Sequence, residues 1–132
     1  MRRPALLVCL LVAASGCGGG DDKKDAEQTV RDFVEALNTH DADRYCDELI
    51  TKEFLEKTTF NTGDEGKARE SCKREFKNLT GLRVNLAKIE GTKVDGDKAT
   101  VTAVLTRQGQ RMEQRLLLEK EDGDWKLAGA AE

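Results

Sequence analysis

The spacing of apolar residues changes once along this chain, near Leu82, and that change limits the possible folds more than any other feature. Between about residues 25 and 79, apolar residues recur every three or four positions, as on one face of an α-helix. Beyond Leu82 they recur at every second position, as in strands with one buried face. Helices followed by strands, without alternation between the two, predict an α+β fold with an antiparallel sheet.

The helical part contains three predicted helices. The first, "DAEQTVRDFVEALNTH", begins at Asp25, whose side chain can cap it, and its apolar face comprises Val30, Phe33, Val34 and Leu37. Asp41 can cap the second helix, "ADRYCDELI", and Thr51 can start one further turn, "KEFLEK". Gly81 ends the third helix, "KARESCKREFKNL", whose inward stripe comprises Ala68, Cys72, Phe76 and Leu79.

The second part contains four predicted strands: "LRVNLAKIEGTKV", "KATVTAVLTR", "QRMEQRLLLEKE" and "DWKLAGA". Turn signals separate them at Asp95-Gly96, Gln108-Gly109 and Asp122-Gly123. The alternation slips before Ile89, which predicts a β-bulge. Together the strands predict an antiparallel meander with one buried face, formed by Leu82, Val84, Leu86, Val101, Ala103, Leu105, Met112, Gln114, Leu116, Leu118, Trp125 and Leu127.

The N-terminus predicts export and lipidation. Arg2 and Arg3 precede about ten apolar residues, whereas a membrane-spanning helix needs roughly 20, so this stretch is typical of an export signal. Its end, Ala14-Ser15-Gly16-Cys17, resembles the lipobox of bacterial lipoproteins, in which the cysteine receives a diacylglycerol and the signal is cut before it. The alternative is a plain secretory signal cut near Ala14, which leaves Cys17 an idle thiol.

The lipoprotein interpretation divides the chain into three parts. Residues 1–16 form the signal peptide, residues 17–25 the lipidated cysteine with a flexible tether, and residues 26–132 one domain. We expect the domain to lie on the extracytoplasmic face of the cell membrane, anchored by the lipid on Cys17.

The chain contains four cysteines. Cys9 is lost with the signal and Cys17 carries the lipid, which leaves Cys46 and Cys72. Two cysteines remaining in an exported domain favour one disulfide, and both fall on inward faces of neighbouring predicted helices. The alternatives are a metal pair or a reactive thiol. Because His40 is the single histidine and no Cys-x-x-Cys spacing occurs, we expect no metal site.

Three helices followed by four antiparallel strands resemble the nuclear transport factor two-like superfamily, which includes SnoaL-like domains. The resemblance covers about residues 26–131 and depends on "VRDFVEALNTHDADRYCDELI" and "GDKATVTAVL…LLLEKEDGDWKL". It implies three helices packed on a curved four-stranded sheet that wraps around the first helix as a cone, often with an apolar cavity. Exported lipoproteins of actinobacterial type are similar, with a lipobox, a short tether and a cysteine pair between the second and third helices. A fold implies no particular activity.

The predicted interior carries little chemistry. We expect the cavity to be lined by Tyr45, Leu86, Val101, Ala103, Met112, Gln114, Leu116 and Trp125. Gln114 is the only polar residue among the inward sheet positions, and its amide can orient a ligand but cannot transfer protons near neutral pH. Ketosteroid isomerase and scytalone dehydratase, enzymes of this superfamily, place acids, bases or hydroxyls there, and their pattern matches no position in this sequence. We expect no catalytic residue.

Some residues have both a functional and a purely structural interpretation. His40 is a possible base, but a histidine beside Asp41 in a turn is typically solvated. Tyr45 can donate a hydrogen bond into the cavity or fill the interface between helix and sheet. Trp125 can anchor the core or line a ligand cleft. A docking surface for a partner can be formed by Arg107, Arg111 and Arg115, but an ordinary solvated sheet face would carry the same charges.

These features predict a membrane-anchored lipoprotein that binds a small apolar ligand or an envelope partner protein, with neither catalysis nor a cofactor. The alternatives are an isomerase-like or dehydratase-like enzyme of the same superfamily and a purely structural interaction module. Nucleic acid is not an expected partner, because the formal charge is −3, and −5 without Arg2 and Arg3.

Overall fold

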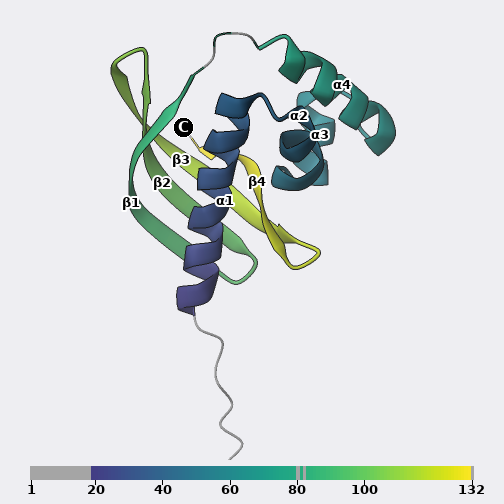
Figure 1. Ribbon diagram of the computed structural model, residues 1–132. Coiled ribbons are helices and arrows are strands. Elements are labelled where there is room, and N and C mark those ends of the chain that lie inside the picture. Colours follow the sequence, from purple (N-terminus) through teal and green to yellow (C-terminus); the bar gives the residue numbers. More distant parts are fainter. Residues whose placement is uncertain (1–18, 80, 82, 132) are drawn as a thin grey trace, which may run out of the picture.

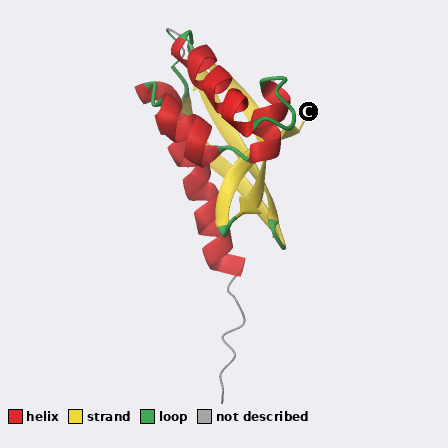
Figure 2. Ribbon diagram, turned by 90° about the vertical axis from the view of Figure 1, so that its right-hand side faces the viewer, coloured by secondary structure: helices red, strands yellow, loops and turns green. Residues whose placement is uncertain are grey.

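The computed structural model of this protein describes residues 19–79, 81 and 83–131. Within these ranges it contains four α-helices, one π-helical turn and a four-stranded antiparallel sheet with the strand order β1-β2-β3-β4. The sheet curves around α1 (Gly19–Thr39), and the shorter helices gather beside one end of α1 (Figures 1 and 2). The predicted α+β class with a curved antiparallel sheet is therefore confirmed.

Helix α1 begins earlier than the sequence predicted. It starts at Gly19, so residues 19–25 form its first turns and are not part of a flexible tether. Asp25 consequently lies inside the helix and is not its cap. Cys17 and the predicted signal peptide, residues 1–16, lie outside the described residues.

Contacts with the sheet explain this early start. Lys120 Nζ lies 2.8 Å from Asp22 Oδ1, and Trp125 Nε1 donates a 3.4 Å hydrogen bond to the same oxygen. One turn later Ala26 is fully buried, and Thr29 Oγ1 donates a 3.1 Å hydrogen bond to the backbone oxygen of Trp125. Helices in proteins are stabilised mainly by tertiary packing, so these contacts extend α1 through a segment whose composition is that of a linker.

The connection after α1 contains α2 (Ala42–Arg44), the π-helical turn η1 (Tyr45–Leu49) and α3 (Lys52–Thr58). The predicted caps are present: Asp41 Oδ1 accepts a 3.1 Å hydrogen bond from the Arg44 amide, and Thr51 Oγ1 accepts one of 3.2 Å from the Phe54 amide. The second predicted helix differs in one respect, because residues 45–49 form a wider π turn.

Helix α4 (Glu65–Lys77) begins and ends slightly before its predicted limits. Asp64 caps its start, since its Oδ1 accepts a 3.0 Å hydrogen bond from the Lys67 amide. Ala68, Cys72 and Phe76 are buried, as the predicted stripe required. Leu79 was predicted to continue that stripe but is 46% exposed, because the helix ends at Lys77 and the chain turns away.

The sheet is an antiparallel meander of β1 (Asn85–Asp95), β2 (Lys98–Arg107), β3 (Gln110–Glu121) and β4 (Asp124–Ala131). The register of β1 against β2 shifts between Leu86 and Lys88, which confirms the predicted bulge, and again between Ile89 and Gly91. A further shift lies between Leu117 and Leu118 in the pairing of β3 with β4. Bulges bend a strand and increase its twist, so they account for the curvature of the sheet around α1.

Two-residue turns join the strands. Gln108 and Gly109 both have positive φ, and so do Asp122 and Gly123, as type I′ hairpins require. The first turn consists of Gly96 and Asp97, one residue later than predicted from Asp95-Gly96. The β2–β3 turn lies at the end of the sheet opposite the start of α1 (Figure 1).

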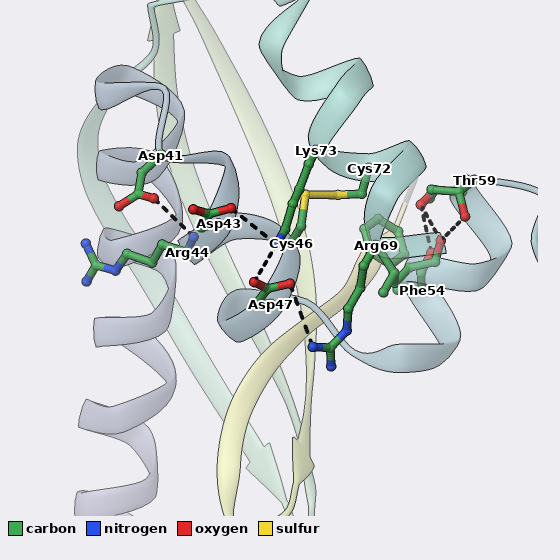
Figure 3. Close-up of a disulfide and its surroundings, with 12 residues drawn as sticks. Asp41, Asp43, Arg44, Cys46, Asp47, Phe54, Thr59, Arg69, Cys72 and Lys73 are labelled. Atoms are coloured by element: carbon green, nitrogen blue, oxygen red, sulfur yellow. Dashed lines mark hydrogen bonds and ion pairs between the residues drawn. A yellow bond between two sulfur atoms is a disulfide. The ribbon is translucent and has the colours of Figure 1, made fainter. Parts of the chain in front are cut away.

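A disulfide joins η1 to α4. The sulfur atoms of Cys46 and Cys72 lie 2.08 Å apart, as the pairing of the two cysteines predicted. Both cysteines are buried. Beside the disulfide, Lys73 Nζ lies 2.8 Å from Asp47 Oδ2, and Arg69 Nη1 lies 3.8 Å from Asp47 Oδ1 (Figure 3). Covalent and ionic contacts therefore both connect the two segments.

Candidate functional site

A cavity of about 320 Å³ lies between the second half of α1, the segment of η1 and α3, and one end of the sheet. Its lining comes from Phe33, Leu37, Tyr45, Phe54, Val84, Leu105, Arg107, Met112, Gln114, Leu116, Leu127, Gly129 and Ala130. Most of these side chains are apolar. Ligand pockets are typically concave and apolar with a few polar groups, and this cavity has that character at the small end of the usual size range.

The rest of the concave face is filled. Ala26 and Val30 from the first half of α1 pack in one core cluster with Val101, Ala103 and Leu118, and each is at most 1% exposed. Small side chains at positions 26 and 103 let α1 approach the sheet closely. The cavity opens only farther along α1, where Phe33 and Leu37 face the ends of the strands.

The structure separates the predicted lining residues into two groups. Tyr45, Met112, Gln114 and Leu116 line the cavity. Four others do not. Val101 and Ala103 are fully buried in the solid part of the core, and half-buried Leu86 packs against that core. Trp125 lines a different, polar depression. Strand alternation identified the inward face correctly but not how far along that face α1 fills it.

The sequence prediction missed part of the wall. Phe33 and Leu37 were assigned only to the apolar face of the first helix, and the structure places both in the cavity wall. Phe54 was placed only in a possible extra turn, and it closes the cavity from α3. A signal was available, because Thr51 caps α3 and thereby fixes the direction of the helix that carries Phe54.

Tyr45 forms part of an aromatic cluster at the cavity wall. Its ring stacks on Phe76 with centroids 4.8 Å apart and lies 5.7 Å from the ring of Phe33. Burial raises the pKa of the Tyr45 phenol above its ordinary value of 10.0. No hydrogen bond to its hydroxyl occurs within the described residues. The group is a neutral donor at physiological pH.

Gln114 and Arg107 are the other polar side chains of the lining. Gln114 is half-buried on β3 opposite Ala103. Arg107 ends β2, is exposed, and pairs in register with Gln110. It lies on the same face of β2 as Leu105, whereas Arg111 lies on the outer face of β3 opposite Thr106. The three arginines considered together from sequence are thus divided between the two faces.

The described lining of the cavity offers few groups for proton transfer. Among its described lining residues there is no aspartate, glutamate or histidine. His40 is exposed in the turn after α1 with φ 55°, as predicted for a solvated turn residue, and it does not line the cavity. General acid–base catalysis needs a proton donor or acceptor within hydrogen-bond reach of the reacting atom, and these three residue types are the commonest ones.

A second depression, of about 630 Å³, lies between α1, η1 and the β3–β4 turn and is polar. Its carboxylates are Asp25, Asp32, Asp47, Glu48 and Asp124. Arg44 Nη2 lies 3.1 Å from Asp32 Oδ1, and Asp47 pairs with Lys73. No cluster of three or more His, Cys, Asp or Glu side chains in the described ranges is placed to hold a metal ion. Salt bridges therefore hold two of the five carboxylates, those of Asp32 and Asp47.

The chain also matches a known family. Residues 26–130 match the model of the SnoaL-like domain. The chain belongs to the SnoaL-like family. The match covers β1 to β3, all but the last residue of β4 and most of α1, so it spans both walls of the cavity. No curated protein compared with this SnoaL-like chain matches it.

Membership fixes the fold more closely than the function. SnoaL-like domains belong to the nuclear transport factor two-like superfamily, which includes ligand-binding members and isomerases. The predicted resemblance of the domain is therefore confirmed. Because this fold supports both ligand binding and catalysis, the composition of the cavity has to distinguish them.

Proposed function

We propose that this SnoaL-like domain is a non-catalytic binding module for a small apolar ligand, anchored to the outer side of the cytoplasmic membrane by a lipid on Cys17. The supporting observation is the 320 Å³ cavity, whose described lining is apolar apart from Tyr45, Gln114 and Arg107. Burial of apolar ligand surface there supplies the driving force for binding, at about 25 cal/mol per Å².

The size of the cavity limits the ligand. Liquid water occupies about 30 Å³ per molecule, so 320 Å³ accommodates on the order of ten non-hydrogen atoms. This corresponds to a medium-length hydrocarbon chain or a two-ring aromatic. Larger ligands would have to extend beyond Met112, which is 41% exposed and has a flexible side chain.

The state of Tyr45 supports binding over catalysis. It contributes the one ionisable hydroxyl of the described lining, and its pKa lies above 10.0. Near neutral pH it therefore stays protonated, so it can donate a hydrogen bond to a ligand but cannot act as a general base. An enzyme in this cavity would need a base that none of the described lining residues supplies.

Sequence features support the membrane anchor. The short apolar run, the lipobox-like "ASGC" and the position of Cys17 together fit a lipoprotein signal. No described helix is both long and apolar enough to span a bilayer. Cys17→Ser should transfer the protein from the membrane fraction to the soluble fraction of cells that express the full chain, whereas Cys9→Ser should not. Complete retention of the Cys17 variant in membranes would rule out a lipid anchor at that residue.

Blocking the cavity tests the binding function. Ala130 is exposed at the cavity wall and pairs with inward-facing Leu116, so Ala130→Phe should place a ring in the cavity without disturbing the core. Ala87→Phe is the matched control, because Ala87 is also exposed but lies away from the cavity. The probe is 1-naphthol, a neutral fluorescent two-ring compound.

We expect the unmodified protein and Ala87→Phe to bind 1-naphthol equally, and Ala130→Phe to bind it at least tenfold more weakly. Mass spectrometry of small molecules that copurify from native membranes should show the same dependence on Ala130. Equal binding by all three proteins, or by none, would contradict the proposed function. In that case an interaction module remains the better interpretation.

A further inference from the structure

Arg107 is the only formally charged side chain in the described lining of the apolar cavity. The remaining lining residues are apolar or neutral, and none carries a carboxylate. No hydrogen bond or ion pair to the Arg107 guanidinium occurs within the described residues, although the chain is rich in acidic side chains. An arginine beside an apolar cavity with no acidic partner is available to pair with an anion.

The sheet register gives the distance along the strands between Arg107 and Gln114, the two polar lining residues of the sheet. Arg107 pairs with Gln110 at the β2–β3 turn, Leu105 with Met112 next, and Ala103 with Gln114 after that. Because a strand rises about 3.4 Å per residue, Arg107 lies roughly 14 Å from the level of Gln114. A ligand that meets Arg107 at the opening must therefore pass an apolar segment before it reaches the next polar group of the sheet.

We propose that the ligand is an amphiphile with a single carboxylate, which Arg107 binds at the opening while the apolar chain lies against Leu105 and Met112. This inference rests on the proposed binding function and specifies the ligand class. A guanidinium matches a carboxylate with two parallel hydrogen bonds, which favours this headgroup. A primary amine would be repelled by the same charge.

The opposite sheet face provides a matched control. Arg111 lies on the next strand, is exposed like Arg107, and faces away from the cavity opposite Thr106. Arg107→Gln and Arg111→Gln remove the same charge from the same hairpin. Any effect of overall charge on binding should be equal in the two variants, whereas an effect of the cavity should appear only at Arg107.

The test uses octanoate, octan-1-ol and octylamine, which share one chain length and differ in headgroup. Titration near neutral pH should show octanoate binding best to the unmodified protein. Arg107→Gln should weaken octanoate binding about threefold to tenfold, leave octan-1-ol binding unchanged, and match Arg111→Gln in thermal stability. Added salt should weaken the binding of octanoate more than that of octan-1-ol. Arg107→Glu should reverse the preference toward octylamine.

The outcomes separate this inference from the proposed function. If octanoate and octan-1-ol bind equally, or Arg111→Gln loses as much octanoate affinity as Arg107→Gln, the headgroup assignment is wrong while the apolar site stands. If none of the three compounds binds and 1-naphthol also fails, the binding function is wrong, and the assignment to Arg107 fails with it.

Discussion

The disulfide between Cys46 and Cys72 should supply a large part of the stability of the domain. The two cysteines are 26 positions apart in sequence. For a closed loop of this length the chain-entropy relation gives about 12 cal/mol/K, or ~3.5 kcal/mol at 25 °C. The stability of a domain is typically about 5–15 kcal/mol, so removal of the disulfide should be readily measurable.

The perturbation is the double substitution Cys46→Ala and Cys72→Ala. Alanine avoids leaving two polar hydroxyls at buried positions, which serine would do. Urea unfolding followed by circular dichroism should show a decrease of about 3.5 kcal/mol in the free energy of unfolding. The denaturant slope should rise as well, because the unfolded chain without a cross-link exposes more surface.

Reduction of the unmodified protein is the control, since it opens the same loop without changing side-chain packing. It should reproduce most of the loss, and the reductant should leave the double variant unaffected. A loss below about 1 kcal/mol in both experiments would refute the argument. It would mean that the unfolded chain keeps enough residual structure without the cross-link to remove most of the entropy difference.

Three further predictions concern titration and the ends of α1. Tyr45 is the only tyrosine, so tyrosinate absorbance should show its pKa above 10.0 in the folded protein, a return to the ordinary value on unfolding, and a further rise when octan-1-ol fills the cavity. The Asp22 pKa is lowered mainly by its hydrogen bond with Lys120, so the stability that this pair contributes is present above about pH 4 and is lost as the pH falls through the lowered value. Asp22→Asn should therefore unfold at a lower urea concentration than the unmodified protein near neutral pH, and this difference should narrow in acid. Asp21 is an exposed neighbour, so Asp21→Asn should unfold at the same urea concentration as the unmodified protein. Equal destabilisation by both substitutions would contradict the role given to Asp22. His40→Ala should leave thermal stability and 1-naphthol affinity almost unchanged, and a large loss of either would reopen a functional role for that histidine.

Much of the fold was predictable because local rules decide it. Asp41 and Thr51 cap helices as their types predict, and the slip in alternation before Ile89 correctly located a bulge. The cysteine pairing followed from the expected export of the chain and from the inward faces of two helices. In each case a single residue type in a short context carries enough information.

The extent of α1 and the position of the cavity were not predictable in this way. Asp22 looks like part of a soluble linker until Lys120 and Trp125, about a hundred positions away, are brought beside it by the sheet. Val101 and Met112 both face inward by alternation, yet one is completely buried and the other is 41% exposed. That difference depends on how closely α1 approaches each strand, which is a property of the tertiary structure.

The early start of α1 has a consequence for how a ligand would arrive. The helix begins two positions after Cys17, so a lipid on that cysteine would leave almost no slack between bilayer and domain. At 1.5 Å per residue, Leu37 lies about 27 Å along the helix axis from Gly19. A domain that stands upright on the bilayer would hold the cavity entrance well above the lipid headgroups. Its ligand would then come from the aqueous envelope or from a carrier protein, and not directly from the membrane.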